Sequence, residues 1–396
     1  MDNNIIMSSK FNWTPVLIAS LVVSIGQFSM GLVFPSLPWI ALDLDISAED
    51  AQRLISFYLL GFGPSQLIYG PISDAIGRKP ILLIGLSLAL LGLTIVLFGS
   101  NSFELLTLGR FIQGLGAGCC AVLARASLRD SYQHDELAQA LSWLTIVASF
   151  TPIIAPVLGG VINHHLGWYA VFVSLFSYIA LVFLLLFFVF NETLPKKQKV
   201  PNLRNILITY SQFLRSRYFI SFATIAWLNF SLVVLTISMM PFIMQIEIGM
   251  NSDQYALWAL IPAFGFLAGS SLSNRLRPKI GIKKTLFIAP MLHGIAAIWL
   301  ISCPVTPLAM MLGQFGLTIG NGLALPCAQT QLLMPYQNKA GSAAAVSGAG
   351  QMIISSLLSM SLMGLGIHQA WHLGLVILIF AVISLLSVIN GFRSLP

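Results

Sequence analysis

One cation lies in the middle of an apolar stretch of this 396-residue sequence. Arg110 falls inside the apolar run 103–125. A charge at the centre of a membrane-spanning helix costs about 2.5–3.5 kcal/mol on insertion scales, so it should face the protein interior and have a polar partner. We expect Arg110 to contact a substrate or to take part in proton coupling. The alternative is a structural arginine that donates to backbone carbonyls, to Gln113 or to Gln27.

Few residues could carry a proton inside the apolar runs. None of the thirteen acidic residues lies near the middle of such a run. Asp74 and Glu104 lie at predicted helix ends, and His293 lies within a run. Histidine titrates near neutral pH, although a single histidine of this kind is more often a hydrogen-bonded packing residue. The residues alone therefore do not identify a proton carrier.

Uncharged polar residues inside the runs could line a cavity for a small-molecule substrate. We expect about half of them to do so, and the rest to face lipid or neighbouring helices. The set is Gln27, Gln113, Trp143, Asn229, Gln314, Asn321 and Gln351. The four cysteines show neither metal-binding nor disulfide spacing and are expected to pack as small apolar residues. Because the runs also hold no nucleophile–base set, we expect no enzyme activity, no metal and no cofactor.

The elements that must position these residues are long apolar helices. The sequence is 57% hydrophobic and 8% charged, and its apolar runs have the ~20 residues that a helix needs to cross a bilayer. We predict an all-α membrane protein. Its twelve spans lie near 14–36, 52–72, 80–99, 103–125, 138–162, 167–190, 218–241, 254–274, 284–302, 306–330, 341–363 and 370–391.

The basic residues report the orientation of these spans. Eighteen of the twenty Lys and Arg residues fall on one side, with Arg53 and Arg110 as the exceptions. Because positively charged short loops stay cytoplasmic, both termini are expected in the cytoplasm. The net charge of +7 is then explained by orientation and by contact with anionic membrane lipid, and not by nucleic acid.

A charged stretch divides the chain into two sets of six spans. We predict an N-terminal half at 1–190, a cytoplasmic linker at 191–217 and a C-terminal half at 218–396. The linker contains a helical pattern of apolar residues, which indicates an amphipathic helix on the membrane surface, with a flexible linker as the alternative. A shift of 204 residues pairs Gly109 with Gly313 and Gly116 with Gly320, among others, and pairs Arg110 with Gln314. Parallel six-helix repeats are typical of transporters that rock two halves about a central site.

The most specific motif is GPISDAIGRKP, which begins at Gly70 and contains Asp74, Gly77, Arg78 and Lys79. A basic inside loop explains the two cations but not the glycines and the aspartate at these offsets. The motif resembles the G-x-x-x-D-x-x-G-R-K signature of the major facilitator superfamily. The resemblance implies that Asp74 caps the predicted helix that begins near Gly341 and Ser342, and so latches the two halves when the cytoplasmic side is closed.

Two further motifs resemble the drug:proton antiporter group of this family. Arg110, Gln113, Gly114 and Gly116 match its R-x-x-Q-G-x-G pattern. The segment SFTPIIAPVLGG resembles the antiporter pattern of the fifth helix through Pro156, Gly159 and Gly160, but Ala155 replaces the glycine before the proline. This variant, with LVFPSLP and RASLRD, resembles the Bcr/CflA, or EmrD-like, multidrug exporters. We expect the proline and the glycines to bend the fifth helix.

The resemblance implies a monomeric exporter of small amphipathic compounds in a bacterial inner membrane, working by alternating access and driven by the proton gradient. The missing core carboxylate weakens the argument for proton antiport. A dedicated exporter of an anionic metabolite, such as a carboxylate siderophore, is the alternative, because a buried arginine without a nearby acid favours a negatively charged ligand. A membrane enzyme or a non-transporting receptor is the third possibility.

Overall fold

The computed structural model describes residues 11–197, 203–367 and 369–394, and these residues form helices and connecting loops without a strand. Lys10 and Lys199, two of the basic residues used to predict orientation, lie outside the described ranges. The elements are α1 (Trp13–Gly31), η1 (Phe34–Ser36), α2 (Leu37–Asp43), α3 (Ala48–Ile76), α4 (Arg78–Phe98), α5 (Phe103–Ser131), α6 (His134–Phe188), α7 (Leu203–Arg215), α8 (Arg217–Pro241), the π-helical η2 (Phe242–Glu247), α9 (Ser252–Trp258), α10 (Leu260–Ser302), α11 (Pro307–Leu333), η3 (Met334–Lys339), α12 (Ala340–Gly364) and α13 (Ala370–Arg393).

Nine helical stretches in the described ranges are long and apolar enough to cross a membrane. Two of them contain two passes each, because α6 turns at Gly167 and α10 turns at Gly281, where φ is +80° and +82°. The 29-residue helix α3, which packs between α5 and α12, supplies a further pass. The predicted arrangement of spans is therefore present, with the fifth and sixth in α6 and the eighth and ninth in α10.

Local sequence explains where several helices begin. Proline lacks an N–H, and Pro35 and Pro38 interrupt the first span, so that η1 and α2 follow α1. Ser47 and Ser102 cap α3 and α5 by accepting from the backbone N–H of Asp50 and Leu105. Such caps satisfy N–H groups that the first turn of a helix leaves without partners.

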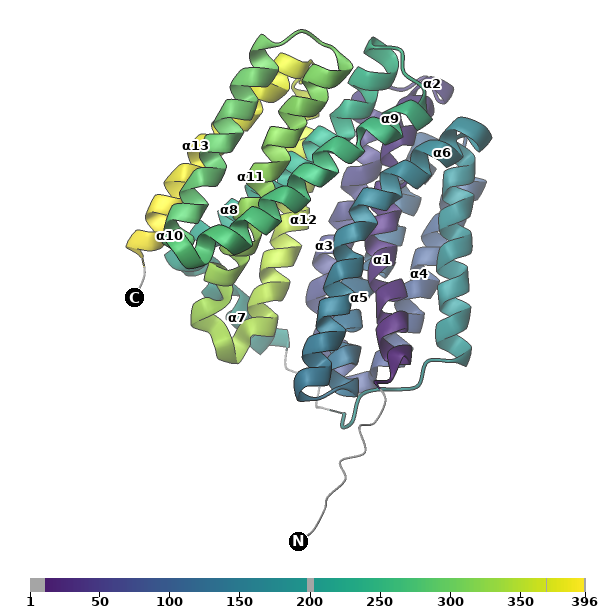
Figure 1. Ribbon diagram of the computed structural model, residues 1–396. Coiled ribbons are helices and arrows are strands. Elements are labelled where there is room, and N and C mark those ends of the chain that lie inside the picture. Colours follow the sequence, from purple (N-terminus) through teal and green to yellow (C-terminus); the bar gives the residue numbers. More distant parts are fainter. Residues whose placement is uncertain (1–10, 198–202, 368, 395–396) are drawn as a thin grey trace.

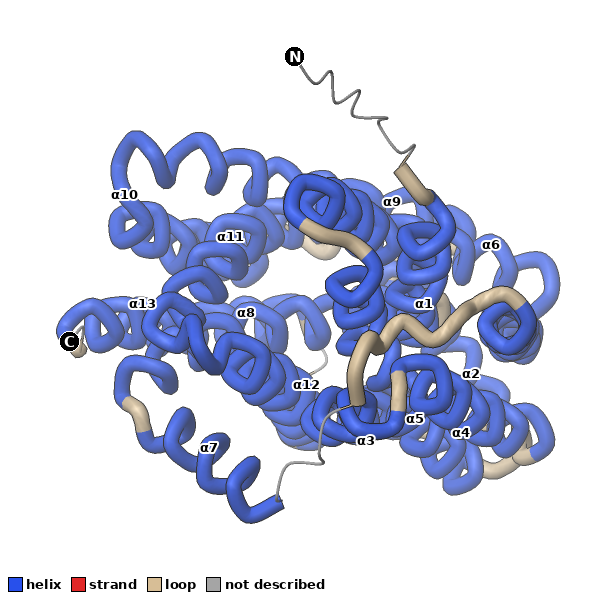
Figure 2. The backbone as a smooth tube through the Cα atoms, turned by 90° about the horizontal axis from the view of Figure 1, so that it is seen from below, coloured by secondary structure: helices blue, strands red, loops and turns tan. Residues whose placement is uncertain are grey.

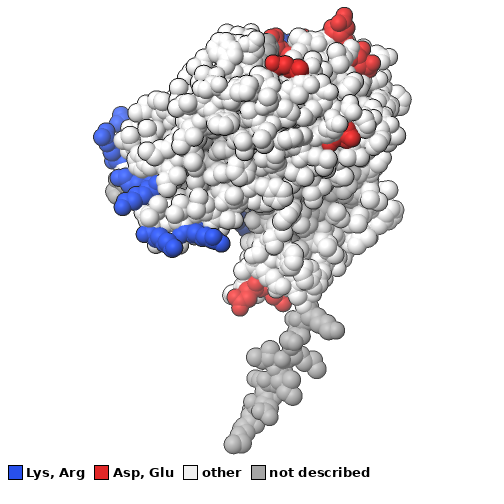
Figure 3. Space-filling view, turned by 45° about the horizontal axis from the view of Figure 1, so that its top comes forward, with Lys and Arg blue, Asp and Glu red and all other residues white. Residues whose placement is uncertain are grey.

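The helices form two bundles that lie side by side. Figure 1 shows α1 and α3–α6 in one bundle and α8 and α10–α13 in the other. Figure 3 shows Lys and Arg side chains along the left and lower-left edge of the molecule, acidic side chains mainly at the upper right, and a smaller acidic group at the bottom. We name the first two the basic end and the acidic end. The basic end carries Arg78, Arg129, Arg215, Arg277 and Arg393, and the acidic end carries Asp45, Asp50, Glu104, Glu247 and Asp253.

The two bundles repeat the same packing contacts with the predicted offset of 204 residues. A methyl group on Gly118 would lie 2.8 Å from the carbonyl O of Phe62, and one on Gly322 would lie 2.3 Å from that of Phe266. Three further pairs of contacts follow the same offset. The contact of Gly61 with Phe111 corresponds to that of Gly265 with Phe315, and the contact of Gly109 with Val96 corresponds to that of Gly313 with Leu300. The contact of Gly116 with Ala89 corresponds to that of Gly320 with His293. Small residues at equivalent positions therefore allow neighbouring helices to pack closely within each bundle.

The predicted amphipathic helix of the linker is α7. Figure 2, viewed from below, shows α7 lying along the edge of the molecule. Phe213 is buried against Phe219 and Tyr336, and the Tyr210 hydroxyl donates to the carbonyl of Leu67 in α3 at 3.2 Å. One face of α7 is thus docked on the protein.

Candidate functional site

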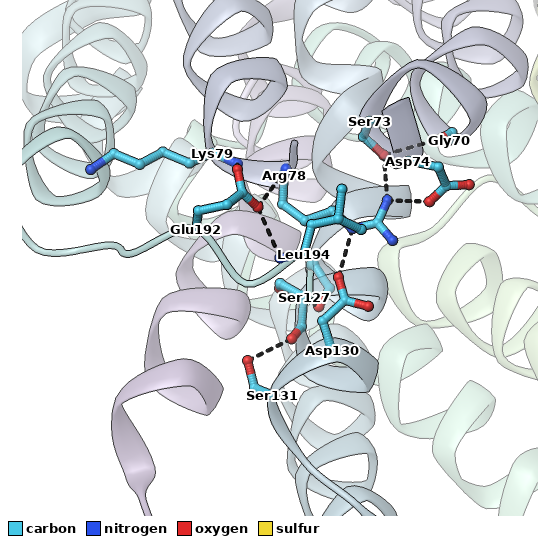
Figure 4. Close-up of polar contacts among 11 residues, drawn as sticks. Gly70, Ser73, Asp74, Arg78, Lys79, Ser127, Asp130, Ser131, Glu192 and Leu194 are labelled. Atoms are coloured by element: carbon cyan, nitrogen blue, oxygen red, sulfur yellow. Dashed lines mark hydrogen bonds and ion pairs between the residues drawn. The ribbon is translucent and has the colours of Figure 1, made fainter. Parts of the chain in front are cut away.

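Arg78 connects three helices at the basic end, as Figure 4 shows. Its Nη1 donates to Asp74 Oδ1 at 2.5 Å and to Ser73 Oγ at 2.6 Å, both in α3. Its Nε donates to Asp130 Oδ2 at 2.7 Å, near the end of α5. The Arg78 and Asp130 side chains are only 8% and 14% exposed. A pair this well buried is costly to break, because one charge would remain without compensation.

Glu192 caps the start of α4 from the segment that follows α6 (Figure 4). Its Oε1 accepts from the backbone N–H of Arg78 at 2.8 Å, and its Oε2 accepts from that of Lys79 at 3.2 Å. Lys79 Nζ in turn donates to the carbonyl of Phe187 at 3.0 Å. A carboxylate at a helix N-terminus is favoured by the helix dipole and by the free N–H groups.

The glycine of this motif has a conformation that other residues rarely adopt. Gly77 has φ +130° and ψ 157°, and a methyl group there would lie 2.3 Å from Glu192 Oε2. Its counterpart in the repeat, Gly281, has φ +82° and ψ 157°. Both glycines mark the turn between consecutive helical passes, which requires a left-handed backbone.

Asp74 does not contact the start of α12 in this conformation. It is 39% exposed and is bonded to Arg78. The N-cap residue of α12 provides no side-chain cap, and apart from the chain neighbours of Gly341 and the backbone of its own helix, no atom of the described residues lies within 4 Å of a methyl group built on it. The latch that the family resemblance implies is therefore not formed here.

Arg110 is completely buried among neutral groups. Its Nη1 donates to Gln113 Oε1 at 2.7 Å, and its Nε donates to the carbonyl of Leu54 at 3.2 Å. Its guanidinium lies 4.5 Å from the centre of the Tyr58 ring, whose negative face attracts a cation. Within the described ranges, Arg110 Nη2 and Gln113 Nε2 have no hydrogen-bond partner. Gln113 and a backbone carbonyl, both proposed from sequence, are thus partners, and Tyr58 is one that the sequence did not indicate.

The other candidate residues are dispersed. Asn229 is buried and donates to the carbonyl of Ile225 at 2.6 Å, and Gln314 is also buried. His293 and Asn321 are buried beside each other, and each has side-chain atoms without a hydrogen-bond partner among the described residues. The remaining members of the set are Gln27 and Gln351, which are half-buried, and Trp143, which is exposed and packs edge-on against Trp13.

Glu104 is exposed at the acidic end, where it accepts from the Ser102 hydroxyl at 2.8 Å. Asp74 is bonded to Arg78, and His293 is enclosed between α10 and α11, where it packs on Gly320. The three proton-carrier candidates therefore lie in three separate environments. No contact in the described ranges brings any of them to Arg110.

The antiporter-type motif of α6 is a packing surface. A methyl group on Gly159 would lie 2.2 Å from the carbonyl O of Leu32 at the end of α1. Ala155 faces Gly31, where a methyl group would lie only 2.5 Å from the Ala155 Cβ. The antiporter pattern has a glycine at position 155, where this chain has alanine. The glycine on the opposing helix, Gly31, provides the space for the Ala155 methyl group. The backbone of α6 remains helical through Pro156 and Gly160. The residue of α6 with non-helical dihedral angles is Gly167, so the motif, where a bend was expected, does not interrupt the helix.

Gly160 belongs to a contact between the two bundles at the acidic end. A methyl group on it would lie 2.5 Å from the carbonyl O of Ser252 and 2.6 Å from the Cβ of Ala256, both in α9. One turn further along α6, Asn163 Nδ2 donates to Ser252 Oγ at 2.7 Å. We name this contact of α6 with α9, together with the hydrogen bonds around it, the acidic-end seam.

Trp39 and Gln245 extend the acidic-end seam. Trp39 Nε1 in α2 lies 2.7 Å from both Gln245 Oε1 and Ser252 Oγ, and Gln245 Nε2 donates to the carbonyl of Pro35 at 2.9 Å. Two further bonds join α3 to α12 at the same end: Gln52 Nε2 donates to Ser359 Oγ at 2.5 Å, and Ser356 Oγ donates to the carbonyl of Ser56 at 2.8 Å. The sequence does not indicate these residues, because isolated Trp, Gln and Ser residues form no motif.

These features define a multi-pass helical membrane protein, built from two packing repeats that are hydrogen-bonded to each other at one end. The sequence profile described as Major Facilitator Superfamily matches residues 18–359. The chain belongs to the major facilitator superfamily.

Named relatives and solved structures agree with this assignment. The chain is 30% identical over 376 residues to the multidrug resistance protein MdtL of Escherichia coli, which covers 92% of this chain and 94% of that protein. It is 29% identical over 289 residues to a bicyclomycin resistance protein homolog of Haemophilus influenzae, which covers 72% of each chain. The fold is similar to that of a D-xylose-proton symporter, with a TM-score of 0.76 at 15% identity over 96% of this chain and 97% of the other. It is also similar to the nucleoside transporter NupG, with a TM-score of 0.75 at 12% identity over 96% and 100%.

Proposed function

We propose that this chain is a secondary transporter, and not an enzyme, that exports small amphipathic, drug-like compounds by alternating access in exchange for protons. The observation that carries the proposal is the unequal contact between the two bundles. At the acidic end α2, α6, η2 and α9 are joined by hydrogen bonds, and at the basic end Asp74 bonds to Arg78 in place of α12. One end is thus tied while a predicted latch at the other is open, as alternating access requires.

The basic end is proposed to face the cytoplasm of a bacterial cell, with the protein in the inner membrane. Short loops rich in Lys and Arg remain on the cytoplasmic side. In this orientation the acidic-end seam closes the outer side, and the conformation is inward-facing. Both chain termini then lie in the cytoplasm.

The names of the relatives support drug-like substrates, since the multidrug resistance protein MdtL aligns over 92% of this chain. A second candidate substrate is an anionic metabolite, such as a carboxylate siderophore. It is favoured by Arg110, which is buried without a carboxylate partner and has an Nη2 group without an acceptor among the described residues. Charge-assisted hydrogen bonds from arginine to carboxylates are among the strongest that proteins make.

Transport into proteoliposomes under an imposed pH gradient tests both candidates. The panel should contain a cationic dye and a tricarboxylate, with native protein and the Arg110→Ala variant. A matched control is Arg53→Ala, since the Arg53 side chain is 46% exposed and pairs with Asp50 at the surface. We expect pH-driven dye transport that Arg110→Ala removes and Arg53→Ala retains. Tricarboxylate transport without dye transport would favour the second candidate, and no pH-driven flux of either would contradict proton antiport.

Contact with lipid and a monomeric state are further parts of the proposal. The face of α7 that is not docked carries Leu207 and Leu214, which are 58% and 50% exposed. Ile208 and Arg215 lie next to them on the helix surface. Apolar side chains beside cations are typical of helices that lie in the headgroup region of an anionic membrane.

A further inference from the structure

The acidic-end seam contains an ionisable pair that joins the two bundles. Gly160, Asn163 and His164 lie on one face of α6, because residues three and four positions apart are neighbours on a helix. The first two contact Ser252 of α9. His164 lies opposite the next residue of α9, with its Nδ1 3.7 Å from Asp253 Oδ1.

The environment of this pair leaves one hydrogen-bond acceptor without a donor. Asp253 Oδ1 is shielded from solvent and has no hydrogen-bond partner in the described ranges. The two side chains as a whole are 35% and 38% exposed, so water and protons can reach the imidazole. A protonated His164 would place a positive charge beside that oxygen, whereas a neutral imidazole would not.

Other ionisable groups near His164 are few among the described contacts. The ring of His165, from the same helix, lies 4.8 Å from that of His164, centre to centre. Asp43, at the end of α2, accepts from Trp168 Nε1 at 3.0 Å, just beyond the turn of α6 at Gly167. Asp253 is therefore the acid whose carboxylate faces the His164 ring in the described contacts, and it comes from the other bundle.

We propose that His164 and Asp253 form a proton-binding site that stabilises the closed acidic-end seam. Proton uptake by His164 creates an ion pair between the bundles and favours the conformation described here. Proton loss removes the ion pair and favours opening of the seam. The inference rests on the proposed function, because it requires a seam that opens and closes.

The expected effect is modest, since both partners are partly exposed. Ion pairs of this kind change a conformational equilibrium by up to about fivefold. The remaining hydrogen bonds of the seam do not titrate near neutral pH. The site would thus adjust the balance between closed and open states according to the pH at the acidic end.

Distance measurements between the bundles test the site in the full-length protein in lipid nanodiscs. Spin labels at Phe98→Cys and Leu365→Cys would report opening, since these positions are 91% and 78% exposed, lie at the ends of α4 and α12, and take no part in the seam. A Cys303→Ser background removes the cysteine that is not buried. We expect the shorter-distance population to increase up to about fivefold when the pH is lowered from 8 to about 5.

His164→Gln and Asp253→Asn should remove this pH dependence, and the matched control His165→Gln should retain it. An equal pH dependence in the native chain and in His164→Gln, with two populations in each, would overturn the proton site alone. A single distance at every pH, in the native chain and in a Gln245→Leu variant with a weakened seam, would overturn both the proton site and the proposed alternation.

Discussion

Arg78 and Asp130 join α4 to α5 through a 2.7 Å hydrogen bond between Nε and Oδ2, and both side chains are largely buried. Arg78 is bonded to Asp74 at a shorter distance, 2.5 Å, but the Asp74 side chain is 39% exposed. The two acids therefore contribute unequally to the stability of the protein. The better-buried partner is Asp130, although the motif GPISDAIGRKP contains only Asp74.

Replacing Asp130 should destabilise the protein more than replacing Asp74. Asp130→Asn leaves Arg78 with a weaker acceptor in a shielded position, and hydrogen bonds to charged groups contribute about 1.5–3 kcal/mol. Asp74→Asn should cost about 1 kcal/mol or less, because solvent screens an exposed pair. Thermal unfolding in detergent, followed by tryptophan fluorescence, measures the difference. Equal losses from the two variants would contradict the unequal burial.

Gly77→Ala should be more harmful than Gly281→Ala. Both glycines have a left-handed backbone, which costs other residues about 1–3 kcal/mol. Only Gly77 has a close neighbour, because its added methyl group would displace the Glu192 carboxylate from the start of α4. Apart from its chain neighbours and the backbone of its own helix, no atom of the described residues lies within 4 Å of the methyl group on Gly281, which makes it the matched control. Unfolding temperatures that fall equally would exclude a structural role for the Glu192 cap.

The aromatic ring beside Arg110 should matter more than its hydroxyl. Tyr58→Phe keeps the ring and loses the 3.0 Å bond to the carbonyl of Gly26, and should cost about 0.5–1.5 kcal/mol. Tyr58→Leu also removes the cation–π contact, which is worth about 2 kcal/mol or more when desolvated. Unfolding and transport should both be measured, and we expect the larger loss in Tyr58→Leu for each. If Phe is as harmful as Leu, the hydroxyl and not the ring supports Arg110.

Neighbouring glycines of α6 should affect different properties. Gly159→Ala forces α6 away from Leu32 within one bundle, and such overpacking costs about 1–3 kcal/mol of stability. Gly160→Ala forces α6 away from α9, in the other bundle, and should open the acidic-end seam with a smaller loss of stability. Unfolding temperature and the labelling rate of a cysteine at Ser252 separate the two effects. Faster labelling in Gly159→Ala than in Gly160→Ala would contradict this assignment.

Two faces of α7 should meet different surroundings. A spin label at Leu207→Cys should be accessible to oxygen, which concentrates in lipid, because this exposed position adjoins the apolar face of the helix. A label at Gln212→Cys, on the opposite side of the helix, should be accessible to a water-soluble nickel complex. Water accessibility at both positions would indicate that α7 does not enter the headgroup region.

The fold could be predicted from sequence because its signals are local or periodic. Apolar runs predicted the spans, and the 204-residue offset of glycines such as Gly116 and Gly320 predicted the packing contacts that both bundles share. The cap from Glu192 and the bond from Trp39 to Gln245 could not be predicted, since each joins segments far apart in the chain. The partners of Arg110 were predicted in part, because Gln113 lies three residues away on the same helix, whereas Tyr58 comes from another helix.

The composition of the acidic-end seam limits how tightly it can hold. Trp39, Asn163, Gln245 and Ser252 are neutral, and when such groups separate, water can replace nearly all that each hydrogen bond contributed. A contact made of packed leucine side chains would instead expose apolar surface to water each time it opened, which is unfavourable. The neutral hydrogen bonds of the seam can therefore part and re-form at low cost, and the modest shift from one proton bound by the His164–Asp253 pair is enough to change the balance between the two states.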